Sequence, residues 1–133
     1  MFKGLREKIR AERKRAETRR FAIEAKDDPQ KSLKDSLYYG QIDFFYYLVS
    51  ELSDHLDVNF IYQGSYLRPI QLACSNASID EVQALLDLGA DLQFKPRYAS
   101  DAILKSVLKN EEHNRQPIWD LLLNSIPLDQ PIQ

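Results

Sequence analysis

The chain has 133 residues, of which 44% are hydrophobic and 29% charged, a composition typical of one soluble globular domain. No apolar run reaches the length of a membrane span, and residues 1–15 lack the apolar core of a secretory signal. A single cysteine excludes an internal disulfide, so the sequence predicts a protein of the reducing cytoplasm.

The first predicted element is a basic helix over residues 1–26. This segment carries ten Lys/Arg and four Glu, a net charge of +6, whereas residues 27–133 carry eight Lys/Arg and sixteen Asp/Glu, a net charge of −8. The segment has no proline and places opposite charges three and four residues apart, which favours one continuous helix. We expect the apolar patch from Phe21 to Ala25 to pack on the rest of the chain, with the tip of the helix projecting.

Several roles remain open for this helix. It is a solvated helix of mixed charge, an arm that binds a partner protein, or a nucleic-acid contact through cations outside the ion pairs. Those cations are Arg6, Lys14 and Arg19. A short apolar stripe also offers a surface for self-association, and it is too short to favour membrane binding. The stripe consists of Phe2, Leu5 and Ile9.

Residues 27–133 contain three related segments, each with two short apolar runs at helical spacing. The segments are Ser32–Val49, Pro69–Leu86, and Ala102–Asn110 continued by Pro117–Leu122. Similar tails, "LDVNF" and "ADLQF", follow the first two. A repeat of this length predicts stacked helix pairs that bury their apolar faces only against neighbours. We place the repeats at about 27–60, 61–94 and 95–130, and we expect the helix over residues 1–26 to cap the first.

The central segment, Arg68–Phe94, resembles an ankyrin repeat. The family pattern of Thr-Pro-Leu-His-Leu-Ala-Ala, a glycine, Val-x-x-Leu-Leu and Gly-Ala-Asp-Val-Asn aligns without a gap. Arg68 and Gln71 replace the usual Thr and His, which we expect to weaken local hydrogen bonding. Ala77 replaces a glycine, which we expect to impose modest left-handed strain. The resemblance implies an all-α fold, an ankyrin-type helical-repeat solenoid of about three helix pairs with a long charged N-terminal helix. A generic helical bundle is the alternative.

Local signals agree with this reading. Ser78 and Glu81 form the capping box of a helix, and Gly89 suits the position just past a helix end. The family has a glycine between the two helices of each repeat, here called the joint. Gly40 keeps this glycine in the first repeat, and Asn110 replaces it in the third.

No catalytic constellation is present in the sequence. His55 and His113 lie in predicted linkers, no cluster has metal-ligand spacing, and no glycine-rich phosphate loop occurs. Cys74 lies on an apolar stripe, which predicts a buried, inert thiol. The sequence therefore predicts a non-enzymatic protein with no cofactor and no metal site.

The ankyrin resemblance also implies a partner-binding face. In that family, partners contact two sets of residues. One set lies at the end of the first (inner) helix of each pair, just before the glycine that separates the two helices. The other set lies in the turn that precedes the Thr-Pro position. The corresponding inner-helix positions are Tyr38, Tyr39, Ser75, Asn76, Leu108 and Lys109. The turn positions are Ile61, Gln63 and Tyr66 in one turn and Lys95, Arg97 and Tyr98 in the next, with Tyr62 as a further candidate. Tyrosine offers a large contact area and a polar tip, although core packing is the alternative for some of these side chains.

These observations predict a protein–protein interaction module. By the resemblance, such a module is an inhibitor, an immunity-like protein or an adaptor, and the acidic residues 27–133 favour a partner with a basic surface. The rival prediction is an adaptor that contacts nucleic acid through its basic N-terminal helix.

Overall fold

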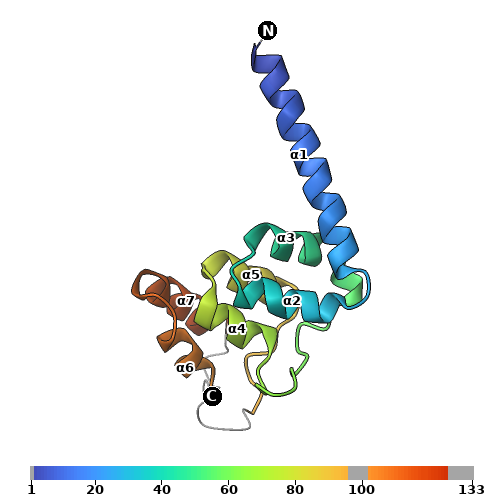
Figure 1. Cartoon of the computed structure of the whole chain (residues 1–133). Helices are drawn as coiled ribbons and strands as arrows, with labels where there is room; N and C mark the ends of the chain where they lie inside the picture. The colour runs from blue at the N-terminus through green and yellow to red at the C-terminus, as the bar shows by residue number, and fades with distance from the viewer. Residues whose placement is uncertain (1, 96–101, 126–133) are drawn as a thin grey trace.

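The computed structural model describes residues 2–95 and 102–125, and every regular element among them is helical (Figure 1). The elements are α1 (Phe2–Ala25), α2 (Pro29–Tyr38), α3 (Ile42–Glu51), the 3₁₀ turn η1 (Ser53–His55), α4 (Pro69–Asn76), α5 (Ile79–Asp87), α6 (Ile103–Leu108) and α7 (Glu112–Asn124). The predicted all-α class is therefore confirmed. No helix in the described part of the chain is both long enough and apolar enough to cross a membrane.

Local sequence explains where most of these helices begin and end. Asp28 accepts a hydrogen bond from the Lys31 amide at 3.0 Å, and Pro29 occupies the first turn of α2. At the start of α5, the Ser78 amide donates to Glu81 Oε2 at 3.2 Å, which confirms the capping box. Gly89 has a φ of +97° directly after α5, as its position predicts.

The seven α-helices include three neighbouring pairs built on one core. Helix α2 packs on α3, α4 on α5, and α6 on α7. Helix α4 also contacts both α2 and α6, and α5 contacts α7, so α4 lies at the centre of the body (Figure 1). The core side chains form a single cluster that runs from Phe21 in α1 to Leu122 in α7. Each short helix is therefore held mainly by its neighbours.

The tails after the first two pairs share one side-chain hydrogen bond. The Asp57 carboxylate accepts from the Asn59 amide at 2.9 Å, and the Asp91 carboxylate accepts from the Gln93 amide at 2.8 Å. The Asn59 side chain then joins the tails, since it donates to the Gly89 carbonyl at 3.1 Å and accepts from the Asp91 amide at 2.7 Å. The similar tails seen in the sequence thus have a shared local structure.

Two substitutions in the central segment have effects that differ from those expected. Ala77 has a φ of −119°, which is ordinary extended backbone, so the predicted left-handed strain is wrong. Gln71 is buried and its side chain accepts from the Arg68 amide at 2.8 Å. Gln71 therefore provides a hydrogen bond at the start of α4, where we had expected bonding to be weakened.

Helix α1 projects from the body as a long rod whose base alone is packed (Figure 1). Phe21 is buried, with its ring stacked on Phe44 at a centroid distance of 4.9 Å and 5.7 Å from that of Tyr47. Ala25 is also buried. Ile23 points away and is 73% exposed, so the apolar patch divides into a docked face and a free face.

The base of α1 should stabilise the body. Phe21→Ala removes a buried ring from the α1–α3 contact and should lower the free energy of unfolding by roughly 3 kcal/mol in urea titrations. Ile23→Ala, two residues away on the exposed face, is the control and should change it by less than about 0.5 kcal/mol. Deletion of residues 1–26 should likewise lower the melting temperature. An unchanged thermal unfolding curve after that deletion would show that α1 is not a cap.

Candidate functional site

The six predicted inner-helix residues lie at the ends of three adjacent helices. Tyr38 and Tyr39 end α2, Ser75 and Asn76 end α4, and Leu108 and Lys109 end α6. Because α4 packs on both α2 and α6, these three helix ends are neighbours in space.

Tyr38 and Tyr39 form an exposed aromatic pair. Their side chains are 62% and 68% exposed, and their rings meet edge to face with centroids 4.9 Å apart. At least one was expected to be exposed, and both are. Exposed aromatic pairs of this kind carry a large apolar area that a partner can cover with little loss of side-chain entropy.

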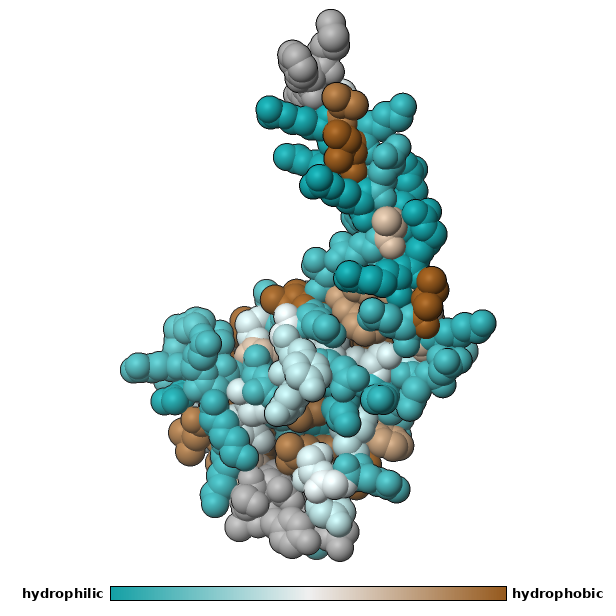
Figure 2. All heavy atoms as spheres, in the orientation of Figure 1, coloured by the Kyte–Doolittle hydropathy of each residue, from teal (hydrophilic) through white to brown (hydrophobic). Residues whose placement is uncertain are grey.

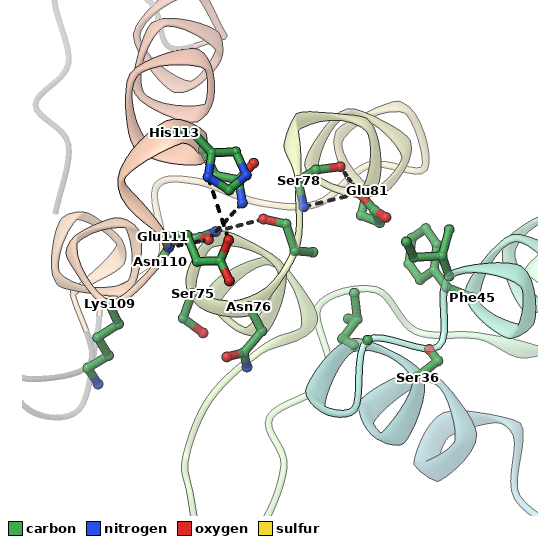
Figure 3. Close-up of a pocket in the computed structure, with 15 residues that line it drawn as sticks. Ser36, Phe45, Ser75, Asn76, Ser78, Glu81, Lys109, Asn110, Glu111 and His113 are labelled. Carbon is green, nitrogen blue, oxygen red and sulfur yellow. Dashed lines mark hydrogen bonds and ion pairs between the residues drawn. The ribbon is translucent and has the colours of Figure 1, made fainter.

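A cleft of about 390 Å³ opens next to the helix ends (Figure 3). Of the predicted residues, Ser75, Asn76 and Lys109 line it, whereas Tyr38, Tyr39 and Leu108 do not. The opposite wall of the cleft holds Ser36 and Phe45, and the Phe45 ring makes part of that wall apolar. The cleft is thus part apolar and part polar, as expected of a surface that orients a partner side chain.

Sequence reasoning missed Glu81 as a cleft residue because its capping pattern accounted for it. The Glu81 side chain is buried and lines the cleft between α3 and α5. Its Oε2 atom accepts hydrogen bonds from both the amide and the hydroxyl of Ser78. Desolvation raises the pKa of Tyr46, and the carboxylates of Glu81 and Asp80 add to this rise.

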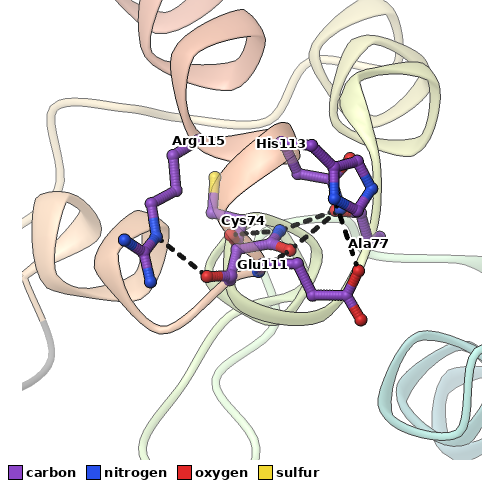
Figure 4. A network of polar contacts seen from close by, with 7 residues as sticks. Cys74, Ala77, Glu111, His113 and Arg115 are labelled. Atoms are coloured by element: carbon purple, nitrogen blue, oxygen red, sulfur yellow. Dashed lines mark hydrogen bonds and ion pairs between the residues drawn. The ribbon is translucent and has the colours of Figure 1, made fainter.

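Asn110 forms the floor of the cleft, and its role differs from the one expected. Tyr66 is the one non-glycine residue of positive φ in the described ranges, so Asn110 is not left-handed. Instead its buried amide donates to the Cys74 carbonyl at 2.9 Å and the Ala77 carbonyl at 2.6 Å (Figure 4). Its Oδ1 accepts from the Glu111 amide at 2.7 Å. Asn110 therefore links the α4–α5 joint to the α6–α7 joint.

The turn before α4 carries the second group of predicted contact residues. The Tyr66 amide donates to the Tyr62 carbonyl and the Tyr62 amide to the Leu67 carbonyl, both at 2.9 Å. Tyr66 is held at a φ of 59°, which is uncommon for a residue with a side chain and occurs disproportionately at functional positions. Ile61, Gln63 and Tyr66 are all exposed on this turn.

Tyr62 is a core residue, so its candidacy as a contact is wrong. Its hydroxyl donates to the Gln30 carbonyl at 2.8 Å and accepts from Gln30 Nε2 at 3.0 Å, and burial raises its pKa above the ordinary value. Lys95, in the next turn, is exposed, and Arg97 and Tyr98 lie outside the described residues. Helix α4 has eight residues, so about 12 Å separates the turn from Ser75 and Asn76.

The three cations proposed for nucleic-acid contact are exposed but do not form one row. At 3.6 residues per turn, Lys14 lies about 80° around the helix from Arg6, and Arg19 about 140° from Lys14. A phosphate backbone lying along one face of α1 would therefore not meet all three.

The described side chains offer little for metal or nucleophile chemistry. No group of three His, Cys, Asp or Glu residues within residues 2–95 and 102–125 is placed to hold a metal ion. His113 lies in the first turn of α7, so its predicted place in a linker is wrong. It is at the surface, with its Nδ1 atom 3.5 Å from the Glu111 carboxylate. Cys74 is fully buried, and desolvation raises the pKa of its thiol to about 12, which confirms the predicted buried thiol.

Comparisons with protein-family models, with curated proteins and with solved structures found no match to this chain.

Asn110 should be important for the stability of the joints. Asn110→Ala removes the partner of two carbonyls, of the Glu111 amide and of the Asn114 side-chain amide, and should lower the free energy of unfolding by roughly 2–3 kcal/mol. Asn124→Ala, at the exposed end of α7, is the control and should change it by less than about 0.5 kcal/mol. Equal effects of the two substitutions in urea titrations would contradict this role.

The Cys74 thiol should make the protein less stable in alkali. Its folded-state pKa lies above the ordinary 9.0, so above that pH the unfolded chain binds fewer protons than the folded one. The free energy of unfolding should fall by about 1 kcal/mol per pH unit between pH values of about 9 and 11. Cys74→Ala should show a shallower slope in the same titration, with a remainder from Tyr62. Identical slopes would contradict the assignment.

Proposed function

We propose that this protein is a non-enzymatic protein–protein interaction module. The fold we propose for it is an ankyrin-type helical-repeat solenoid of three helix pairs, α2–α3, α4–α5 and α6–α7. Three observations support that fold: the side-by-side packing of α2, α4 and α6, the positive φ of Gly40 and Gly89, and the same side-chain hydrogen bond at Asp57 and Asp91.

The partner-binding face has two parts, the exposed turn at Ile61, Gln63 and Tyr66 and the ends of the inner helices next to the cleft. The buried residues Pro69–Cys74 of α4 lie between the two parts. The observation that carries the proposal is the high exposure of Tyr38 and Tyr39, whose rings meet edge to face next to a cleft. A chain that leaves two such aromatic rings in water forgoes burial free energy that a partner can recover.

Charge defines the kind of partner. Residues 27–133 carry a net charge of −8, and the cleft holds the carboxylates of Glu81 and Glu111 against one lysine, Lys109. A partner with a basic surface is therefore attracted and oriented, whereas an acidic surface is repelled. A nucleic-acid-handling enzyme is one class with such a surface. If the bound enzyme loses activity the module is an inhibitor or immunity-like protein, and if it does not, the module is an adaptor.

The test is affinity capture from the native cell, with aromatic variants used to define the face. Tyr38→Ala and Tyr39→Ala together should weaken the captured partner's affinity by about thirtyfold or more, the loss typical of two hot-spot side chains. Tyr46→Ala, which removes a part-exposed tyrosine from α3, is the matched control and should leave the affinity within about twofold. A partner that binds the double variant as tightly as the natural protein would contradict the proposed face.

A further inference from the structure

The free face of α1 carries an apolar stripe longer than the three residues at its tip. Leu5, Ile9, Ala16 and Ile23 follow one another at spacings of four, seven and seven residues, so they share one side of the helix, and Glu12 and Arg19 occupy the positions between them on that side. All four are exposed, with Leu5 at 56% and Ile9 at 40%. Brown apolar side chains recur accordingly along the otherwise teal rod in Figure 2.

This stripe faces away from the body. Ile23 follows Phe21 by two residues, which places the two side chains about 160° apart around the helix axis. Phe21 is docked on Phe44, so the stripe is directed to the opposite side. Packing within the described part of the chain therefore leaves the stripe uncovered along the length of α1.

Cations border the stripe on both sides. Arg6, Arg13 and Arg20 follow one border at seven-residue spacing, and Lys8 and Arg15 follow the other. All five are exposed. One of them, Arg20, lies 3.9 Å from the Glu17 carboxylate. The seam between these basic rows is apolar except at Glu12 and Arg19. A partner helix whose apolar seam lies between two acidic rows therefore matches it best.

The border charges argue against a second copy of this chain as the occupant. A parallel pair of α1 helices would set Lys8 and Arg15 of one copy beside the Arg rows of the other. An antiparallel pair would set each basic row against its own equivalent. Both arrangements place like charges together, which is destabilising at these positions. Nucleic acid is also a poor fit, because the centre of the face holds Leu5, Ile9 and Ile23, which gain nothing from phosphates.

We propose that α1 is a docking helix for an acidic amphipathic helix of a partner protein, bound along the Leu5–Ile9–Ala16–Ile23 stripe. The apolar seam supplies the contact area, and the basic rows select a partner helix whose seam is bordered by Asp and Glu. This surface is separate from the Tyr38–Tyr39 face. It favours an acidic partner surface, whereas the Tyr38–Tyr39 face favours a basic one. The two surfaces can therefore engage two sites of mixed polarity on one partner or two different proteins.

The test uses two synthetic helical peptides of 24 residues as probes against the full-length chain. Both have leucine at the two seam positions of each heptad, and the bordering positions are glutamate in one and lysine in the other. Fluorescence anisotropy should show binding of the glutamate peptide and none of the lysine peptide. Added salt should weaken the binding, because the border pairs are exposed to solvent.

Two matched pairs of variants separate the stripe from the net charge. Ile9→Asp and Ile23→Asp place a carboxylate on the stripe, whereas Ala11→Asp and Ala22→Asp place the same charge on the other faces of α1. All four positions are exposed, so the fold should be retained, which circular dichroism checks. The stripe variants should weaken binding about tenfold or more, and their partners by less than about threefold.

Several results would overturn the proposal. Equal losses in both members of each pair would show attraction by net charge alone. Tighter binding to duplex DNA, or to phosphatidylserine vesicles, than to the glutamate peptide would assign the arm to phosphate groups or to lipid. A doubling of the 15.5 kDa mass in sedimentation that Ile9→Asp abolishes would assign the stripe to a second copy. Binding of the lysine peptide as tightly as the glutamate peptide would remove the charge selection.

Discussion

The packing of α4 between α2 and α6 is the constraint on which the rest of the structure depends. Each of these inner helices has ten residues or fewer, too short to persist alone in water. Their stability comes from a side-by-side arrangement that buries Leu37, Ile70 and Val107 in one core. Because the three helices lie side by side, their ends are brought to one level, and the residues at those ends become one surface. The candidate site is thus a direct consequence of how the core is closed.

Polar side chains at the ends of these helices stabilise the connections between helices and also form part of the surface. Asn110 ties two joints together through the Cys74 and Ala77 carbonyls, and Glu81 fixes the start of α5 through Ser78. Both side chains also line the cleft. Buried polar groups with satisfied partners give a surface a fixed shape, which favours specific recognition over general adhesion. The aromatic pair next to the cleft supplies the apolar area that such polar groups do not.

Features that depend on near neighbours in the chain were predictable from the sequence. The capping box of Ser78 and Glu81, the left-handed Gly89 and the docked residues Phe21 and Ala25 all follow from local patterns. The sequence did not predict features set by distant contacts. Tyr62 is buried because Gln30, 32 residues away, accepts and donates hydrogen bonds at its hydroxyl. Asn110 replaces a glycine in the alignment, yet its role is set by carbonyls 33 and 36 residues earlier. The Glu81 pattern specified a cap correctly but gave no sign that the carboxylate would also face a cleft.

We propose that the helix-end surface is the functional part of the body and that α1 is a separate arm. Amide hydrogen exchange of the natural chain, free and bound to its captured partner, distinguishes this arrangement from binding elsewhere on the body. We predict new protection at the three helix ends, residues 38–41, 75–78 and 108–111, and at the turn of residues 61–66. Protection confined to the outer helices α5 and α7, with the helix ends unchanged, would contradict it.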